Sequence, residues 1–257
     1  MIQEAFWMLR RPIRYSLSPR RLLSSWRRDI AAWQRFWDSY QRYKQLAPVN
    51  EQPLLEHLYP CLGEDTAETL IEPTYFYQDA WAFEKIVKQR PAQHIDVGSH
   101  HKFVALLSKV VPVTMVDIRP LSLPLDTLNF KAGSILELPF EDGSVESLSS
   151  LCVVEHIGLG RYGDPLDSKG TEKAIAELCR VLAPGGHLYL SVPVGDQSVV
   201  AFNAGRIFSL DHLFELFKPL VVVDRSFIVG NSLQKDYQHS GGFGTTGLFE
   251  LVKHKDV

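Results

Sequence analysis

Strand and helix patterns alternate along the last two thirds of the chain. From residue 91 onward, short apolar runs typical of buried strands alternate with segments of helical spacing. This alternation favours a mostly parallel sheet, because parallel strands are joined by crossover helices that cover the faces of the sheet. The last two expected strands, residues 220–229 and 247–254, are joined by a polar, glycine-rich segment instead of a helix. We therefore predict an α/β fold with a mostly parallel sheet, an antiparallel last strand and helices on both faces.

The first 47 residues form a basic segment. They carry ten Arg or Lys and three Asp or Glu, a net charge of +7, whereas the rest of the chain carries 17 basic and 27 acidic residues, a net −10. Ser18 followed by Pro19 is typical of a helix N-cap with proline in the first turn, and Pro48 ends the helical pattern. We predict a basic amphipathic helical extension over residues 1–47.

An apolar stripe runs along this predicted helix. Its members recur at spacings of three and four residues and include three tryptophans: Leu23, Trp26, Ile30, Trp33, Trp37 and Tyr40. A stripe of this size needs a cover, and we expect it to pack on the rest of the chain. The alternatives are a homodimer contact, a contact with another partner and a position on a membrane surface.

The middle of the chain connects this extension to the sheet. Residues 48–74 hold four prolines and indicate an ordered linker, and the aromatic-rich stretch 74–90 predicts a helix that ends before Pro91. The expected organisation therefore has three parts: the extension at 1–47, the linker and flanking helix at 48–90, and the α/β domain at 91–257.

Composition argues against several classes of protein. Cys61, Cys152 and Cys179 are widely spaced and odd in number, which disfavours a disulfide framework or a zinc site. No apolar run reaches the length of a membrane span, and the N-terminus lacks the pattern of a signal peptide. The acidic body disfavours an extended nucleic-acid surface. We expect a cytoplasmic protein with no transmembrane segment and no nucleic-acid partner.

The stretch AQHIDVGSHHKFV begins as a strand and continues as a helix. In an open parallel sheet the ligand lies at the carboxyl ends of the strands, so this first turn is the expected site. Gly98 permits close approach of a ligand, Ser99 supplies a hydroxyl, and the helix that starts near His100 offers free N–H groups. Asp117 ends the next strand, 21 residues after Asp96, where a carboxylate can bind both hydroxyls of a ribose. These residues predict a cofactor of the adenosine type.

Residues 92–252 resemble a known family of enzymes. The order DVGS, MVDIRP, GSILELPFEDGSVESLSSLCVVEHI and ELCRVLAPGGHLYLSVP is similar to that of the class I S-adenosylmethionine-dependent methyltransferases, which have a Rossmann-like fold. The segments LYPCLGEDT, YFYQDAW, EHIGLGRYGDPLD and FNAGRIFSL resemble more closely an uncharacterised methyltransferase-like family known only as a domain of unknown function. That closer resemblance begins near residue 54.

The resemblance implies roles for the matched positions. The cofactor S-adenosyl-L-methionine would be bound by residues that follow the first three strands: Asp96 and Gly98 on the methionine side, Asp117 at the ribose, and Ile118, Ser134 and Ile135 at the adenine. Three residues at the end of the fourth strand would face the sulfonium and the methyl acceptor: Val154, Glu155 and His156.

The first turn departs from the pattern of the resembled family, which usually has three alternate glycines after the acid. This chain has Asp96-x-Gly98-x-His100-x-Lys102. One interpretation is that His100 and Lys102 bind the methionine carboxylate as cations, in place of bare backbone N–H groups. The other is that they fill the pocket and abolish cofactor binding. We favour retained binding, because the other elements of the site remain.

The stretch EHIGLGRYGDPLD, residues 155–167, is the expected reaction centre, and we call it the glycine loop. Methyl transfer needs an aligned acceptor and, for a hydroxyl or amine, a base that takes its proton. His156 has a suitable ordinary pKa, and Glu155 would orient it or take the proton itself. Arg161 suits an anionic acceptor, and the glycines would let the loop close. The predicted catalytic residues are His156, Glu155, Arg161, Tyr162 and Asp164.

A purely structural glycine loop is the alternative. Glu155 or His156 would then cap the following turn, and Arg161 and Asp164 would form a local ion pair. Glu155, Asp164 and Asp167 are of the residue types that bind magnesium, but their spacing does not require a metal, and we predict none.

Two further groups of residues flank the expected site. Aromatic side chains of the helix before the first strand either cover the cofactor or pack in the core: Tyr75, Phe76, Tyr77 and Trp81. Asn203 and Arg206 follow the fifth strand and are candidates to reach the acceptor.

The sequence thus favours an S-adenosylmethionine-dependent methyltransferase that acts on a small-molecule or saccharide acceptor, at oxygen or nitrogen. The alternative is an inactive methyltransferase-like scaffold that binds a partner through its N-terminal helix. A nicotinamide-dependent dehydrogenase is disfavoured, because no second domain is large enough to hold the molecule that exchanges the hydride.

Overall fold

The computed structural model of the protein describes residues 19–119, 121–239, 241 and 243–254. The chain divides into two compact units, residues 1–70 and Ile71–Val257. The boundaries that we expected at residues 47 and 90 stay a prediction.

The first unit contains the predicted N-terminal helix, α2 (Pro19–Leu46), and two short 3-10 turns, η2 (Val49–Glu51) and η3 (Leu55–His57). The helix is confirmed, whereas its expected cap, Ser18, lies outside the described residues. The segment that follows α2 folds back on it: the Tyr40 hydroxyl donates to the Pro53 carbonyl at 3.2 Å, and Arg35 pairs with Asp65 at 2.7 Å.

The aromatic stripe of α2 is only partly covered within the described structure. Trp33, Phe36, Trp37 and Tyr40 form successive edge-to-face pairs along the helix. Even so, Trp26, Trp33 and Trp37 are exposed over 69%, 43% and 42% of their surface. The expectation that the stripe packs on the rest of the chain stays a prediction.

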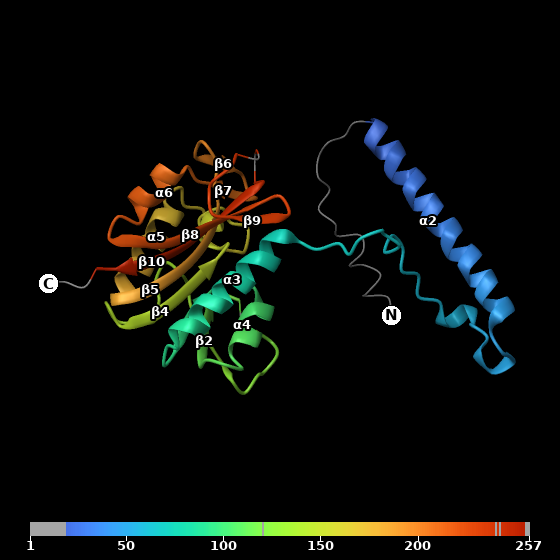
Figure 1. The fold of residues 1–257 in the computed structure, drawn as a ribbon, viewed down its shortest axis with the longest axis horizontal. Helices are drawn as coiled ribbons and strands as arrows, with labels where there is room; N and C mark the ends of the chain where they lie inside the picture. Colours follow the sequence, from blue (N-terminus) through green and yellow to red (C-terminus); the bar gives the residue numbers. More distant parts are fainter. Residues whose placement is uncertain (1–18, 120, 240, 242, 255–257) are drawn as a thin grey trace. The chain divides into compact units, whose positions relative to one another are not determined.

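The second unit is built around an eight-stranded sheet (Figure 1). Across the sheet the strands follow in this order: β3 (Leu128–Ala132), β2 (Val113–Asp117), β1 (His94–Val97), β4 (Val145–Leu151), β5 (Leu182–Pro193), β10 (Thr245–Lys253), β8 (Leu220–Val229) and β9 (Ser232–Gln234). Pairing from β3 through β5 is parallel. The last strand, β10, is antiparallel to both of its neighbours, β5 and β8, as predicted.

Two small elements were not predicted. One is the edge strand β9, which pairs antiparallel with β8. The other is a separate hairpin of β6 (Val199–Ala201) and β7 (Gly205–Ile207). Each of these strands has only three residues, which is too short for an alternation of apolar and polar side chains to be recognised.

Helices cover both faces of the sheet, and each face has its own core. On one face α5 (Gly170–Val181) and α6 (Leu210–Leu216) pack on the strands through Ile175, Leu178 and Leu213. On the other, α3 (Pro73–Gln89) and α4 (His101–Leu107) contribute a second core. Figure 1 shows these pairs of helices on opposite sides of the sheet. Every residue of the central strand β1 is buried. The predicted three-layer α/β architecture is confirmed.

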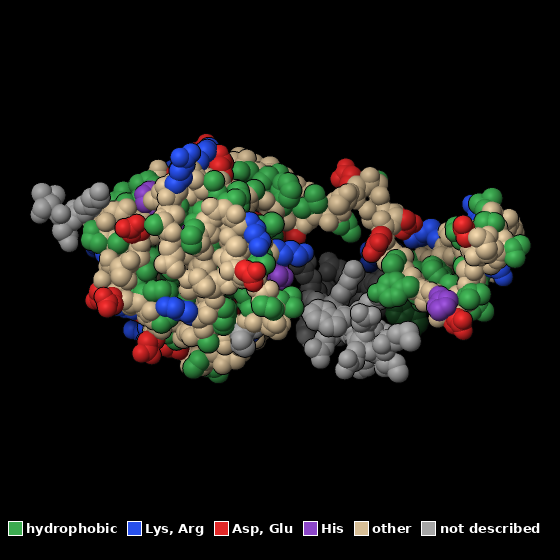
Figure 2. Space-filling model, turned by 90° about the horizontal axis from the view of Figure 1, so that it is seen from below, with side chains coloured by type: hydrophobic (Ala, Val, Ile, Leu, Met, Phe, Trp, Pro, Cys, Tyr) green, Lys and Arg blue, Asp and Glu red, His purple; other side chains and the backbone are tan. Residues whose placement is uncertain are grey.

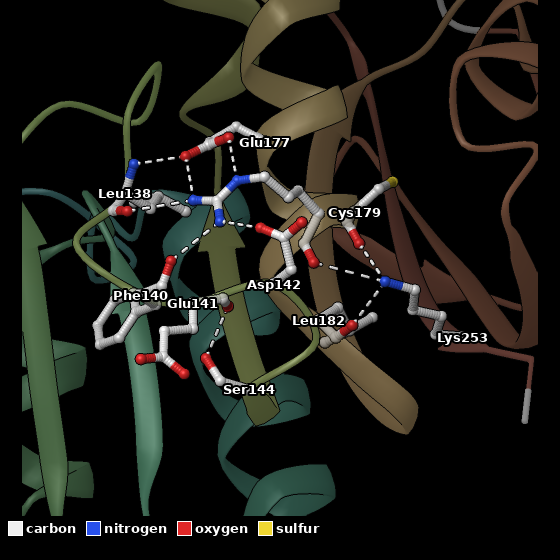
Figure 3. A network of polar contacts seen from close by, with 10 residues as sticks. Leu138, Phe140, Glu141, Asp142, Ser144, Glu177, Cys179, Leu182 and Lys253 are labelled. Atoms are coloured by element: carbon white, nitrogen blue, oxygen red, sulfur yellow. Dashed lines mark hydrogen bonds and ion pairs between the residues drawn. The ribbon is translucent and has the colours of Figure 1, made fainter.

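An arginine network fixes α5 to the sheet (Figure 3). The guanidinium of Arg180 pairs with Glu177 on its own helix and with Asp142 in the loop before β4, both at 2.6 Å. It also donates to the Phe140 carbonyl at 3.0 Å. At the end of the helix, Lys253 of β10 donates to the carbonyls of Cys179 and Leu182, each at 2.8 Å. These bonds satisfy carbonyl groups that the end of a helix leaves free.

The surface of the second unit carries charges of both signs. On the face shown in Figure 2, Lys and Arg side chains are interspersed with Asp and Glu. Within the part of the chain that the structure describes, no helix is both long and apolar enough to cross a bilayer. At 28 residues α2 has the length, but it is rich in arginine.

Candidate functional site

The carboxyl ends of β1, β2 and β4 meet at one edge of the sheet. The register places Asp96 of β1 beside Met115 of β2 and Ser149 of β4. A cavity of about 520 Å³ lies at this edge, within the range typical of small-molecule sites. Eleven of the residues singled out from the sequence as cofactor-binding or catalytic line it: Gly98, Ser99, His100, Asp117, Ile118, Ser134, Ile135, His156, Arg161, Tyr162 and Asp164. The structure thus brings most of the predicted site together.

Asp96 lies behind the cavity wall. It is fully buried, and its carboxylate accepts hydrogen bonds from the Ser149 hydroxyl at 2.5 Å and from the Ser99 backbone N–H at 3.1 Å. Burial raises the pKa of Asp96 to about 6, although these hydrogen bonds oppose the shift. The Ser149 hydroxyl also contacts the ring of His94 at 2.9 Å. The bonds of Asp96 therefore shape the first turn, and its role at the cofactor stays a prediction.

The first turn, residues 98–102, depends on Gly98. Its φ of +71° lies in the region that favours glycine, and a Cβ there would lie 3.1 Å from Val153 Cγ1. The next residue, Ser99, accepts a hydrogen bond from the Leu151 N–H at 3.0 Å. The turn therefore presents its backbone to the cavity while its hydroxyl is used within the protein.

His100 does not plug the cavity as a cation. Its Nδ1 accepts from the Lys102 backbone N–H at 3.3 Å, so the imidazole caps α4, and its ring centre lies 5.0 Å from that of Tyr75. Burial, His101 and Lys102 lower the pKa of His100, which makes it neutral at neutral pH. Lys102 is not part of the cavity wall. Only His100 of the two is placed to contact a ligand, as a neutral ring.

Asp117 ends β2 and lines the cavity beside Arg119. One carboxylate oxygen accepts the Arg119 backbone N–H at 2.7 Å, and the Arg119 Nε lies 3.6 Å from the same oxygen. Ser134 and Ile135 follow β3 on the same wall. This arrangement suits the expected ribose and adenine positions, because the carboxylate is held in place and an apolar side chain lies close by.

Glu155 is a buried acid beside the cavity. It is only 2% exposed, its Oε2 has no hydrogen-bond partner among the described residues, and its Oε1 lies 3.6 Å from His156 Nε2. Burial raises the pKa of Glu155 to about 8, so the acid is mainly protonated at neutral pH. It is not part of the cavity wall, and its contact with a ligand would pass through His156.

His156 lines the cavity as a neutral imidazole. Burial, followed by the positive charge of Arg161, lowers the pKa of His156 to about 4. The unpredicted hairpin β6–β7 packs against the ring, since a Cβ on Gly205 would lie 3.1 Å from His156 Nδ1. The same nitrogen lies 3.4 Å from Arg161 Nη1. The imidazole is therefore held between the hairpin, an arginine and a buried acid.

Asp164 organises the glycine loop through the backbone. It accepts N–H bonds from Gly158 at 2.7 Å, Tyr162 at 3.2 Å and Gly160 at 3.4 Å. Partial burial raises the pKa of Asp164, but these donors outweigh that effect and hold the pKa below its ordinary value. A purely structural loop was expected to have an ion pair between Arg161 and Asp164, and the described ion pairs do not include it. Arg161 instead donates to the Ala204 carbonyl at 2.7 Å.

Several other candidates lie away from the cavity. Val154 is fully buried in the core that α5 and α6 share. Arg206 is also buried, and it donates to the Ile157 carbonyl at 2.6 Å, which supports the glycine loop from behind. Asp167 pairs with Lys173 at 2.6 Å. The wall also leaves out Asn203 and, from the flanking helix, Phe76, Tyr77 and Trp81, whereas Tyr75 is part of it.

The cavity residues missed in the sequence include Arg119 and Cys152. Arg119 lies two residues beyond Asp117, and Cys152 directly follows β4 with a φ of +53°, which is unusual for a residue other than glycine. The Cys152 thiol donates to Gln78 at 3.2 Å, and burial raises its pKa well above the ordinary value, so it stays protonated. Their positions just past strand ends were the available signal. In the described residues, no group of three or more His, Cys, Asp or Glu is placed to hold a metal ion.

The chain is similar to proteins of known structure. A family model described as "Caenorhabditis protein of unknown function, DUF268" matches residues 141–225. A "putative sarcosine dimethylglycine methyltransferase" from Galdieria sulphuraria shares 19% identity, covering 71% of this chain and 87% of that one, with a TM-score of 0.51. The N-methyltransferase NodS from Bradyrhizobium japonicum WM9 shares 14% identity over 71% of this chain and 98% of its own, with a TM-score of 0.50.

No curated protein matches the sequence. The solved structures nevertheless support the resemblance found in the sequence. The chain therefore has the fold of the class I S-adenosylmethionine-dependent methyltransferases.

Proposed function

We propose that the protein is an S-adenosylmethionine-dependent methyltransferase. The observation that carries this proposal is the cavity at the ends of β1, β2 and β4, which has Gly98 on one side and Asp117 on another. The residues present fit the cofactor: Gly98 leaves a cradle that a Cβ would narrow, and Asp117 supplies a carboxylate for a ribose. Tyr75 and Ile118 line the same space and suit flat or apolar parts of a ligand.

The chemistry proposed for the chain rests on His156. S-adenosylmethionine, when bound, supplies an electrophilic methyl group. His156 is neutral at neutral pH and accepts the proton of an acceptor hydroxyl or amine. Glu155 lies 3.6 Å from the ring and orients it. Tyr162 and the rest of the glycine loop help to exclude water from the reacting atoms.

The acceptor is proposed to be a small molecule or a saccharide, methylated at oxygen or nitrogen. The cavity volume suits a small ligand. The two solved relatives have names that describe an N-methyltransferase and a methyltransferase for sarcosine and dimethylglycine. This likeness supports a small acceptor without selecting between oxygen and nitrogen.

Calorimetric titration with S-adenosylhomocysteine tests the proposal against the alternative of an inactive scaffold. We expect saturable binding in the micromolar range, about −8 kcal/mol, and a loss of affinity in Asp117→Asn. An Asp142→Asn variant is the matched control, because this acid lies in the arginine network of α5 and not at the cavity. Absence of binding at millimolar ligand would remove the enzyme and favour the scaffold.

For the alternative in which the stripe of α2 does not pack on its own chain, we propose that α2 contacts a second copy of this chain in a cytoplasmic homodimer. Its stripe has the three–four spacing of packed helices, and Trp26, Trp33 and Trp37 are exposed. Free cysteines, including the exposed Cys61, suit a reducing compartment. Light scattering should give a dimer for the native chain and a monomer for Trp33→Ser/Trp37→Ser. A native monomer would contradict the dimer.

A further inference from the structure

Two guanidinium groups lie over one aromatic ring on the cavity wall. The Cζ of Arg119 is 4.5 Å from the ring centre of Tyr162, and the Cζ of Arg161 is 5.0 Å from it. The two arginines come from different elements, one after β2 and the other in the glycine loop, and all three residues line the cavity. Because cations are attracted to the faces of aromatic rings, Tyr162 concentrates positive charge at this part of the wall.

Arg161 is anchored, but its charge has no counter-ion. Its Nη1 donates to the Ala204 carbonyl at 2.7 Å and lies 3.4 Å from His156 Nδ1. Its Nε and Nη2 make no hydrogen bond to a described residue, and no described carboxylate forms an ion pair with it. The anchored guanidinium therefore keeps free N–H groups beside the proposed base.

The two acids of the cavity wall are already engaged. Asp164 accepts three backbone N–H groups of the glycine loop, so its charge is largely offset by these donors. Asp117 lies next to Arg119 and accepts its backbone N–H. Glu155, the nearby buried acid, is mainly protonated at neutral pH. The positive charge of Arg161 is thus the one that remains unbalanced on the described wall.

We infer that Arg161 binds a carboxylate or phosphate group carried by the methyl acceptor, next to the atom that His156 deprotonates. A guanidinium with free N–H groups matches the geometry of these oxyanions. The inference rests on the proposed function and narrows the acceptor to acidic small molecules, such as uronates, hydroxy acids or phosphorylated sugars. Neutral and cationic acceptors would gain no charge-assisted hydrogen bond from this guanidinium.

Titration of two simple anions into the full chain tests this inference. Inorganic phosphate and, separately, acetate are titrated by calorimetry into protein saturated with S-adenosylhomocysteine, with sodium chloride as the control for ionic strength. We expect saturable binding of at least one anion, and a loss of affinity of about tenfold to hundredfold in Arg161→Gln. Arg161→Lys should keep part of the affinity. The anion whose affinity falls more in Arg161→Gln is the one that Arg161 prefers, which distinguishes phosphate from carboxylate.

The outcomes separate this inference from the proposed function. If S-adenosylhomocysteine does not bind, the proposed function fails, and the same anion titrations on the free chain still test Arg161. Arg42→Gln is the matched control, because this exposed arginine of α2 forms no described ion pair and should leave anion affinity unchanged. Circular dichroism verifies that Arg161→Gln is folded. Equal anion affinity in native protein and Arg161→Gln, or no saturable binding in either, would overturn the inference.

Discussion

The first turn and the glycine loop follow neighbouring strands, β1 and β4, and border the same cavity, yet they use their side chains differently. In the first turn Ser99 bonds to Leu151 and His100 caps its own helix. In the glycine loop His156 and Arg161 line the cavity with polar atoms that remain available. The first turn therefore supplies shape and backbone, whereas the glycine loop supplies side-chain chemistry.

Burial explains this difference. The strand before the first turn is covered on both faces, so the polar groups of Asp96 and His94 are satisfied by serines inside the protein. The glycine loop is shaped by backbone bonds to Asp164 and by the buried Arg206. A loop that is held through its backbone can leave its side chains free for a ligand.

The largest effect is expected from adding a side chain at the most tightly packed glycine of the glycine loop. A Cβ on Gly158 would lie 2.0 Å from the Asp167 carbonyl oxygen, and its φ is +81°. We expect Gly158→Ala to lower the free energy of unfolding by about 4 kcal/mol, from the combined clash and backbone strain. Denaturant unfolding followed by circular dichroism measures this change.

Gly163→Ala is the matched control for Gly158→Ala. Its φ of +89° is equally unfavourable for alanine, but no atom lies within 4 Å of the new Cβ. Only the strain of about 1–2 kcal/mol should remain. Equal losses in the two variants would show that packing against Asp167 does not hold the glycine loop in place.

The second prediction compares the buried acids of the two segments by their pH dependence. The pKa of Glu155 is raised from 4.5 to about 8, so its stabilising contribution is complete below pH 4.5 and is lost as the pH rises to 8. Between pH 5 and pH 9 this loss lowers the free energy of unfolding of the native protein by on the order of 3 kcal/mol. We expect this pH-dependent decrease to be absent in Glu155→Gln. Denaturant unfolding at several pH values measures it.

Asp96 provides the contrast, because its pKa is raised only from 3.8 to about 6. Its contribution is complete below pH 3.8 and lost by pH 6, so Asp96→Asn should flatten the profile in that lower window alone. A native profile that is flat between pH 6 and 8, or one that Glu155→Gln leaves unchanged, would contradict the assignment of the higher window to the glycine loop.

The third prediction compares the two cavity acids as ligand groups. Asp117→Asn should weaken the binding of S-adenosylhomocysteine by about tenfold to hundredfold, because the proposed ribose loses a charged acceptor. Asp164→Asn should change this affinity less than Asp117→Asn, since its carboxylate bonds to the backbone of the glycine loop. Calorimetric titration of both variants gives the comparison. A larger loss of affinity in Asp164→Asn would indicate that the cofactor binds away from the end of β2.

The fold could be predicted because short apolar runs typical of strands alternate with segments of helical spacing along the chain. That signal is absent over β6, β7 and β9, because strands of three residues are too short to show a period. The site was predicted as far as strand ends reveal it, which located Gly98 and Asp117. Arg119 lies just past the end of β2, which was the signal available for it, whereas the Ala204 carbonyl meets Arg161 only through tertiary packing, and no local pattern marks that contact.

Val154 shows where the pattern fails. Its predicted position came from the resemblance, which placed it at the end of the fourth strand. The backbone turns at Cys152, with φ +53°, and enters a 3-10 turn, η4 (Val154–His156). Val154 then faces the core, whereas His156 reaches the cavity. Sequence alone does not reveal that turn, because cysteine rarely adopts a positive φ.

The smallest expected effect concerns His100, where the first turn departs from the glycine pattern of the resembled family. If the imidazole serves as a helix cap, His100→Ala should lower the free energy of unfolding by about 0.5–1 kcal/mol, and His100→Asn should restore it, because asparagine is a good N-cap. The affinity for S-adenosylhomocysteine should change by less than about threefold in both, since backbone groups and Asp117 make the proposed contacts. A large loss of affinity without a loss of stability would instead make His100 a direct ligand, and the first turn would then bind through a side chain as the glycine loop does.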